Sequence, residues 1–278
     1  MLLPDAPRRA ASIRERGELY RQQHFPRTGD LLLELARVVE AGEDDKREAT
    51  FNQIAPTYRQ EYSGGDSDFL ALHDFIDGNI KGAISANSAM FTRKLLEVTP
   101  LISSMGKAAT VMGKMATVFL SRGRLPKEEQ YYAACLLHAM DIEGQFDEAC
   151  RLNYVFFKAS LGEDVTLSEA AGLTIRQMRD RMRQDSGGRS EILFFGWQEG
   201  HLRNCFAHMR ITYDATNNTM HFVDVNSSGV ETYNETWSYD QFAKFYHLAN
   251  GVPLVFLHLT MILGARDMAF AANPFQMN

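Results

Sequence analysis

The sequence predicts an all-α fold, a helical bundle with a small β-hairpin inserted before the last helix. Apolar residues recur at spacings of three and four over most of the chain, and glycines, prolines and capping residues divide these stretches into helix lengths. Between about residues 210 and 235 the apolar period changes from 3.6 to 2, which is typical of strands. The 278 residues allow one or two domains with a sizeable core.

The first half of the chain, residues 1–122, is predicted to be a helical region of unknown role. Residues 1–28 are charged, contain three prolines and show little periodicity, so we expect an arm or a loosely docked segment there. The apolar spacing and the glycines and prolines then predict helices from Leu31 to Gly42, onward to Tyr62 with a break at Pro56, from Asp68 to Val98 before Pro100, and from Ile102 to Leu120.

The second half, residues 123–278, is predicted to be a bundle that carries the hairpin. Thr166 and Glu169 have the spacing of a capping box, which predicts a helix start. The other signals predict a helix from Pro126 to Gly162, a turn at Gly187-Gly188, a helix from Ser190 to about His208, strands around Ile211 and Phe222, and a last helix from Ser238 to about Leu263 with a kink at Gly251 and Pro253.

Composition limits the classes of function. A net charge of −6 and a pI of about 5.8 argue against a large non-specific nucleic-acid surface, but leave room for a small cleft that holds one or two phosphates. Cys135, Cys150 and Cys205 form no CxxC pair, so we expect neither a disulfide framework nor a zinc knuckle, and a reducing cytoplasm as the location. The apolar run Leu254–Leu263 is too short to span a bilayer and contains His258, so we expect a buried core helix and no membrane partner.

One short segment carries most of the functional information. The run Arg203-Asn204-x-x-Ala207-His208 stands at the end of a predicted helix and directly before the hairpin. An Arg followed five positions later by a His is common by chance, so the specificity lies in the fuller run and its context. Asn204 and His208 are four residues apart and share a helix face, whereas Arg203 is offset by about 140° and reaches that face through its long side chain.

This run resembles the RxxxxH motif of the HEPN superfamily, in which a polar residue, often Asn, follows the Arg. The resemblance covers roughly residues 125–265. It implies a bundle closed by a hydrophobic helix, a metal-independent endoribonuclease without a cofactor, RNA as the partner, and a homodimer in which the motifs of two protomers meet. It also implies a role as a toxin or in phage defence, with an antitoxin or regulatory protein as a further partner.

The residue types suit that chemistry. When a phosphodiester is attacked by its own 2′-hydroxyl, one group must move a proton and a cation must stabilise the developing charge. Histidine is the residue type that exchanges protons near neutral pH, so His208 suits the first role, and the planar donors of Arg203 suit the second. Asn204 would orient the substrate or the imidazole. We therefore predict Arg203, Asn204 and His208 as the catalytic residues.

Four further arginines are candidates for contacts to the RNA backbone. Arg176, Arg179 and Arg183 lie at spacings of three and four on the helix before the motif, and Arg189 lies in the following turn. If this helix lies beside the motif helix, these arginines would bind phosphates. A solvated basic helix face is the alternative explanation.

Other interpretations remain beside the enzyme. Glu199 and Arg203 have the spacing of a helical salt bridge, so the motif could belong to a non-catalytic dimerisation or scaffold module. Gly106–Lys114 has the wrong glycine spacing for a phosphate-binding loop and follows no predicted strand. His73 and Asp77 share a helix face, but a lone pair at this spacing is usually a surface contact rather than a metal site.

Overall fold

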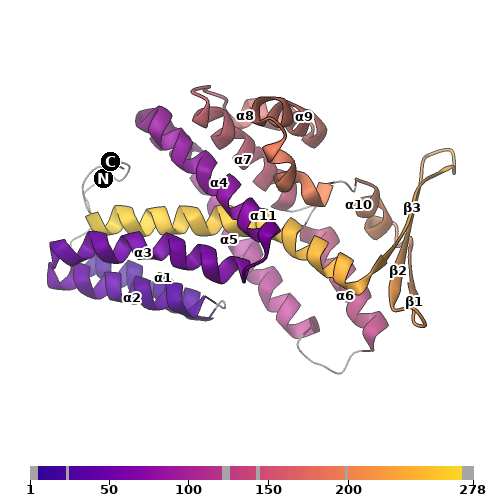
Figure 1. Ribbon diagram of the computed structural model, residues 1–278, viewed down its shortest axis with the longest axis horizontal. Helices are drawn as coiled ribbons and strands as arrows, with labels where there is room; N and C mark the ends of the chain where they lie inside the picture. The colour runs from indigo at the N-terminus through magenta and orange to yellow at the C-terminus, as the bar shows by residue number, and fades with distance from the viewer. Residues whose placement is uncertain (1–5, 23–24, 121–125, 142–144, 198–199, 271–278) are drawn as a thin grey trace.

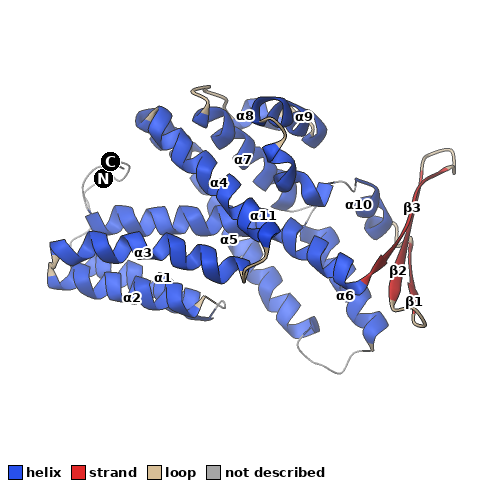
Figure 2. Ribbon diagram, viewed as in Figure 1, coloured by secondary structure: helices blue, strands red, loops and turns tan. Residues whose placement is uncertain are grey.

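A computed structural model describes residues 6–22, 25–120, 126–141, 145–197 and 200–270; for a few residues inside these ranges, Arg203 among them, it describes only the backbone. Most of the described chain is helical, and a small antiparallel sheet stands directly before the last helix (Figures 1 and 2). The predicted fold class is therefore confirmed. The insertion has three strands instead of the two of a hairpin.

The N-terminal half consists of five helices. The first of them corrects the prediction of an arm, because residues 6–22 form a helix that packs closely on the next one. A Cβ added at Gly17 would lie 3.1 Å from the carbonyl oxygen of Gly29, so the two backbones approach without side chains between them. The helices are α1 (Ala6–Gln22), α2 (Pro26–Ala41), α3 (Asp44–Ser63), α4 (Ser67–Ala86) and α5 (Ser88–Leu120).

The break between α4 and α5 lies at Asn87 and not, as predicted, at Pro100. Asn87 has extended backbone angles, and its side-chain oxygen accepts a hydrogen bond of 2.9 Å from the Met90 amide, which caps α5. Pro100 lies inside α5 and removes the hydrogen bond to the carbonyl of Leu96. Leu96 is 71% exposed, so that carbonyl can be hydrated instead.

In the C-terminal half, the helices before the sheet are shorter than predicted. The helices predicted over 126–162 and 190–208 are each divided in two, with residues 142–144 and 198–199 outside the described chain. The Thr166 capping box is confirmed, but it opens only one short helix, and a second box at Thr174 and Gln177 opens the next. The elements are α6 (Lys127–Asp141), α7 (Asp147–Ser160), α8 (Leu167–Ala171), α9 (Ile175–Ser186), the 3₁₀ helix η2 (Arg189–Trp197) and α10 (Gly200–Ala207).

The sheet and the last helix follow without a break. Strands β1 (Ile211–Asp214), β2 (Thr219–Val225) and β3 (Glu231–Ser238) pair antiparallel in sequence order, and α11 covers Tyr239–Phe270. Alternate residues of β2, beginning at Met220, are buried against α10 and α11. The predicted start of the last helix at Ser238 is confirmed by a capping box: the Ser238 amide donates to the side-chain oxygen of Gln241 at 2.8 Å, and the Gln241 amide donates to the Ser238 hydroxyl. The helix continues seven residues beyond the predicted end at Leu263.

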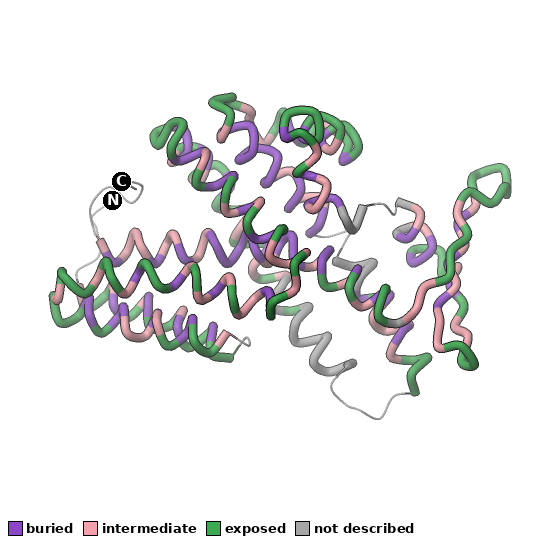
Figure 3. Tube along the Cα trace, in the orientation of Figure 1, coloured by how far each residue is buried: buried purple, intermediate pink, exposed green. Residues whose placement is uncertain are grey.

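Helix α11 is the shared centre of the fold, as the buried positions along it show (Figure 3). The helix contributes to three hydrophobic cores. The first part of α11 packs with α6, α10 and the sheet, and its last part packs with α1–α3. The middle part of α11 belongs to the largest core, which it shares with α4, α5, α7, α8, α9 and η2. Among the described residues it is the one helix long and apolar enough to cross a membrane. However, 67% of its most apolar window is buried in the fold, as is typical of a core helix.

The predicted domain boundary after residue 122 lies in residues 121–125, outside the described chain, and stays a prediction. Helices from both sides of it share one core: α4 packs on α7, and α11 contacts helices of both halves.

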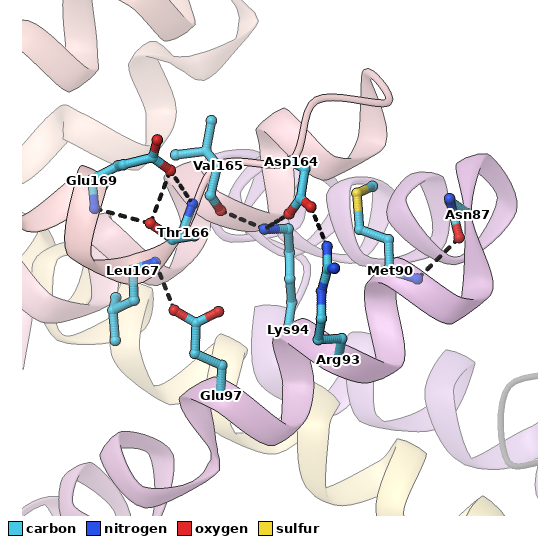
Figure 4. Close-up of polar contacts among 10 residues, drawn as sticks. All are labelled: Asn87, Met90, Arg93, Lys94, Glu97, Asp164, Val165, Thr166, Leu167 and Glu169. Carbon is cyan, nitrogen blue, oxygen red and sulfur yellow. Dashed lines mark hydrogen bonds and ion pairs between the residues drawn. The ribbon is translucent and has the colours of Figure 1, made fainter.

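Polar contacts also fasten the loop between α7 and α8 to α5 (Figure 4). The Lys94 side chain is 1% exposed, and its ammonium lies 2.7 Å from a carboxylate oxygen of Asp164 while donating to the Val165 carbonyl. One turn later, Glu97 accepts a hydrogen bond of 3.0 Å from the Leu167 amide. These three contacts join residues about 70 positions apart in the chain.

Candidate functional site

Helix α10 carries the predicted motif, and its residues range from buried to solvent-exposed. Leu202, Cys205 and Phe206 are buried against the sheet and α11. Asn204 is partly buried, and His208, in the turn that follows the helix, is exposed. The side chain of Arg203 and the whole of Glu199 lie outside the described residues, so their predicted roles stay predictions.

The chain leaves α10 through a strained turn. Met209 has a φ of +51°, in the left-handed region. The Arg210 amide donates to the Cys205 carbonyl at 2.8 Å and the Met209 amide to the Phe206 carbonyl at 3.2 Å, which together make a Schellman motif. Glycine usually occupies this position because a Cβ is disfavoured there. A non-glycine residue in this conformation therefore stores strain directly beside His208.

Replacing Met209 by Gly is expected to stabilise the protein by about 1 kcal/mol, because the left-handed conformation then carries no steric penalty. Urea unfolding followed by circular dichroism would measure the change. Met209→Ala is the matched control: it removes a half-exposed side chain but keeps the Cβ, so the gain should be absent. Equal stability of the Gly and Ala variants would contradict the assigned strain.

A buried carboxylate from the sheet anchors the motif helix. Asp224 of β2 is 4% exposed, and its Oδ2 accepts a hydrogen bond of 3.0 Å from the Asn204 side-chain amide. The Nδ1 of His201 lies 3.0 Å from the same oxygen, and a guanidinium nitrogen of Arg210 lies 3.5 Å from Oδ1. Burial raises the pKa of Asp224, but the hydrogen bonds from Asn204 and His201 outweigh it and leave the pKa below its usual value. The group is thus an ionised carboxylate at neutral pH.

His201 is the residue of this cluster best placed to react. Its side chain is 45% exposed, and its ring stacks on Tyr233 of β3 with centroids 5.4 Å apart and planes within 8° of each other. Since Nδ1 faces Asp224, Nε2 lies on the opposite side of the ring. A histidine oriented in this way by a carboxylate can accept or donate a proton.

The sequence-based prediction of the site did not include His201 and Asp224, although the sequence contains an indication for each. His201 precedes His208 by seven residues, which is two helical turns and returns to the same face. Asp224 continues the alternation that buries Met220 and Phe222, so it is a carboxylate at a core position of a strand. Buried charges are costly unless they are paired, so such a position marks a polar site.

The four arginines predicted to bind phosphate do not join this cluster. Arg176, Arg179 and Arg183 lie on α9, and Arg189 begins η2. Helix α9 packs against α7 and η2, whereas α10 packs against β2 and α6 (Figure 1). Arg179 lies 2.6 Å and Arg183 3.8 Å from the carboxylate of Glu191, and Arg189 donates to the Ser186 carbonyl at 3.2 Å. Arg176 is 80% exposed and 4.0 Å from Asp180. A contact between these arginines and RNA remains a prediction.

The alternatives of phosphate loop and metal site find no support in the described chain. Residues 106–114 lie inside α5 and follow no strand. His73 is buried, and its Nδ1 lies 3.4 Å from Asp74. Among the residues that the structure describes, no three His, Cys, Asp or Glu side chains are grouped to hold a metal ion.

No known protein family, curated protein or solved structure matches this chain. Its function has to be inferred from the residues of the site.

Proposed function

We propose that this chain is a metal-independent endoribonuclease of the HEPN type, acting in the cytoplasm as a toxin or phage-defence effector. The observation that supports it best is the exposed imidazole of His208, one turn after an Asn204 whose amide is fixed by the buried carboxylate of Asp224. A rigidly held polar surface with an exposed titratable group suits acid–base catalysis. The resemblance of residues 203–208 to the HEPN motif supplies the substrate class, RNA.

In this proposal the 2′-hydroxyl of RNA attacks the adjacent phosphorus. The new 2′-O–P bond forms while the P–O5′ bond breaks, which leaves a 2′,3′-cyclic phosphate and a free 5′-hydroxyl. His208 transfers a proton, and the guanidinium of Arg203 stabilises the charge that develops on the phosphate oxygens. Asn204 positions these groups. The homodimer and the antitoxin or regulatory partner belong to the same proposal and rest on the resemblance alone.

Purified protein is expected to cleave a mixed RNA substrate with EDTA present and to leave cyclic phosphate ends. His208→Ala should lower the rate by roughly 10²–10⁴-fold, and Arg203→Ala by roughly 10²–10³-fold, because each removes one catalytic group. His221→Ala and Arg37→Ala are matched controls, since both residues lie outside the Asp224 cluster. Gel analysis with end-group mapping would measure rates and products.

The competing proposal is a non-catalytic scaffold module. The contacts of Asp224 with Asn204 and His201 join α10 to β2, which such a module would need as well. If the wild type leaves every RNA intact while His208→Ala and Arg203→Ala fold and assemble as the wild type does, the scaffold is the better explanation.

A further inference from the structure

The motif helix carries a second histidine on the face of His208. Seven residues separate His201 from His208, which corresponds to two turns, about 20° of rotation and about 10 Å along the helix axis. Asn204 lies between them on the same face. By this spacing, His201 and Asn204 share one face of α10, and His208 continues that face in the turn directly after the helix.

Two neighbouring strands fix the ring of His201. Asp224 and Tyr233 are direct partners in the register of β2 and β3, so one cross-strand pair supplies both the carboxylate at Nδ1 and the aromatic ring beneath the imidazole. Thr232 donates a hydrogen bond of 3.3 Å to the backbone carbonyl of Asp224, which joins the two strands again at this point. Both the plane and the edge of the imidazole are therefore determined by the sheet.

The ionised Asp224 can only accept hydrogen bonds, so the neutral imidazole carries its proton on Nδ1. Nε2 then has a free lone pair and lies on the side of the ring away from Asp224. This is the tautomer that a general base requires. A histidine that served only to join α10 to the sheet would have no need of a half-exposed ring.

We propose that His201 is the general base of RNA cleavage and His208 the general acid, with Asp224 and Tyr233 as positioning residues. This inference rests on the proposed ribonuclease function. Nε2 of His201 takes the proton of the 2′-hydroxyl as the 2′-O–P bond forms. Protonated His208 gives its proton to the 5′-oxygen as the P–O5′ bond breaks. The two imidazoles return to their starting forms by proton exchange with water.

The test compares rate–pH profiles of wild type, His201→Gln and His208→Gln from pH 4 to 9 with EDTA present. The wild type is expected to give a bell-shaped profile. His201→Gln keeps an N–H donor for Asp224 but has no proton acceptor, so it should lose the acidic limb and roughly 10²–10⁴-fold in rate. His208→Gln should lose the alkaline limb. His221→Gln is the control, because His221 binds Asn234 outside the cluster.

The outcomes separate the two proposals. If His201→Gln keeps the wild-type rate and both limbs while His208→Gln is inactive, the base assignment is overturned and the ribonuclease stands. If folded wild type cleaves no RNA at any pH, the ribonuclease fails and the base assignment with it. Circular dichroism of each variant shows whether a lost rate reflects a lost fold.

A readout without RNA tests the geometry. Nitrogen-15 NMR of the imidazoles is expected to find the proton of neutral His201 on Nδ1, and a proton on Nε2 would overturn the assignment. Tyr233→Leu removes the ring that stacks on the His201 imidazole, so it should change the pH profile and lower the cleavage rate about tenfold. Tyr233→Phe keeps the stacking and should retain the wild-type rate and pH profile. Equal profiles for both variants would remove Tyr233 from the proposal.

Discussion

Lowering the pH from 7 to 4 is expected to cost this protein about 3 kcal/mol of unfolding free energy through His258 alone. His258 lies in the middle of α11, is 6% exposed, and has its Nδ1 2.9 Å from the hydroxyl of Tyr58. Burial lowers its pKa from 6.5 to about 4. The unfolded chain takes up this proton near pH 6.5 and the folded chain only near pH 4, so stability is lost as the pH falls between these values.

Other groups add to this effect without obscuring it. Burial also lowers the pKa of His73 and His247, so both contribute with the same sign. Carboxylates with a lowered pKa, such as Asp74 beside Arg59, lose their contribution only below about pH 4. The window between pH 4 and 6.5 therefore reports mainly on buried histidines.

Urea unfolding at pH 7, 6, 5 and 4 would measure the loss. His258→Asn keeps a polar group near Tyr58 but cannot take a proton, so it should be less stable at pH 7 and show a pH dependence about 3 kcal/mol smaller. His221→Asn, at a partly buried position of β2 outside the cluster around His258, is the matched control. Identical slopes for wild type and His258→Asn would show that His258 is protonated equally in both states.

Gly251→Ala is expected to destabilise the protein by about 3 kcal/mol, at the upper end of the range for overpacking. A Cβ at position 251 would lie 2.2 Å from the Tyr62 hydroxyl oxygen and 3.0 Å from a methyl carbon of Leu72. Gly251 lies on α11 in the core, Leu72 is fully buried and the Tyr62 hydroxyl is itself buried, so a new methyl group would meet packed atoms on both sides. The helix contacts α3 and α4 closely only because this residue has no side chain.

A second substitution should relieve the clash. The Tyr62 hydroxyl is buried without a hydrogen-bond partner among the described residues, so Tyr62→Phe should cost little and make room for the new methyl group. The double variant should therefore be more stable than Gly251→Ala alone. Gly78→Ala is the control: it lies in α4 with open space around it, and a gain of roughly 0.5–1 kcal/mol is expected. Additive effects of the two core substitutions would contradict the steric explanation.

Local signals predicted the fold class and several helix ends, because caps and alternation depend on residues close in the chain. The Thr166 and Ser238 capping boxes and the inward positions of β2 are examples. The helix over residues 6–22 was missed because its buried positions are few and include small residues such as Gly17. What holds it is contact with α2 and with α11, which is about 240 residues away.

In the candidate site too, features set by neighbouring residues could be predicted, whereas contacts between distant residues could not. Asn204 and His208 could be placed on one helix face from their spacing alone. Asp224, the partner of Asn204, is 20 residues further on and reaches Asn204 only through the packing of β2 on α10. The stacking of Tyr233 on His201 depends in addition on the register of β3. Contacts between residues this far apart in the chain cannot be predicted from apolar periodicity or from a short motif.

The position of α11 also dictates when the molecule can fold during synthesis. Each of the three cores needs residues of α11, which leaves the ribosome after every other element described here. Tyr20 contacts a residue 238 positions later. At 5–20 residues per second, α1 waits roughly 10–50 s for that partner, exposed to chaperones and proteases. Phe242 and Phe245 of α11 also support α10 and the sheet, so a nascent chain cannot complete the proposed catalytic surface before α11 has emerged.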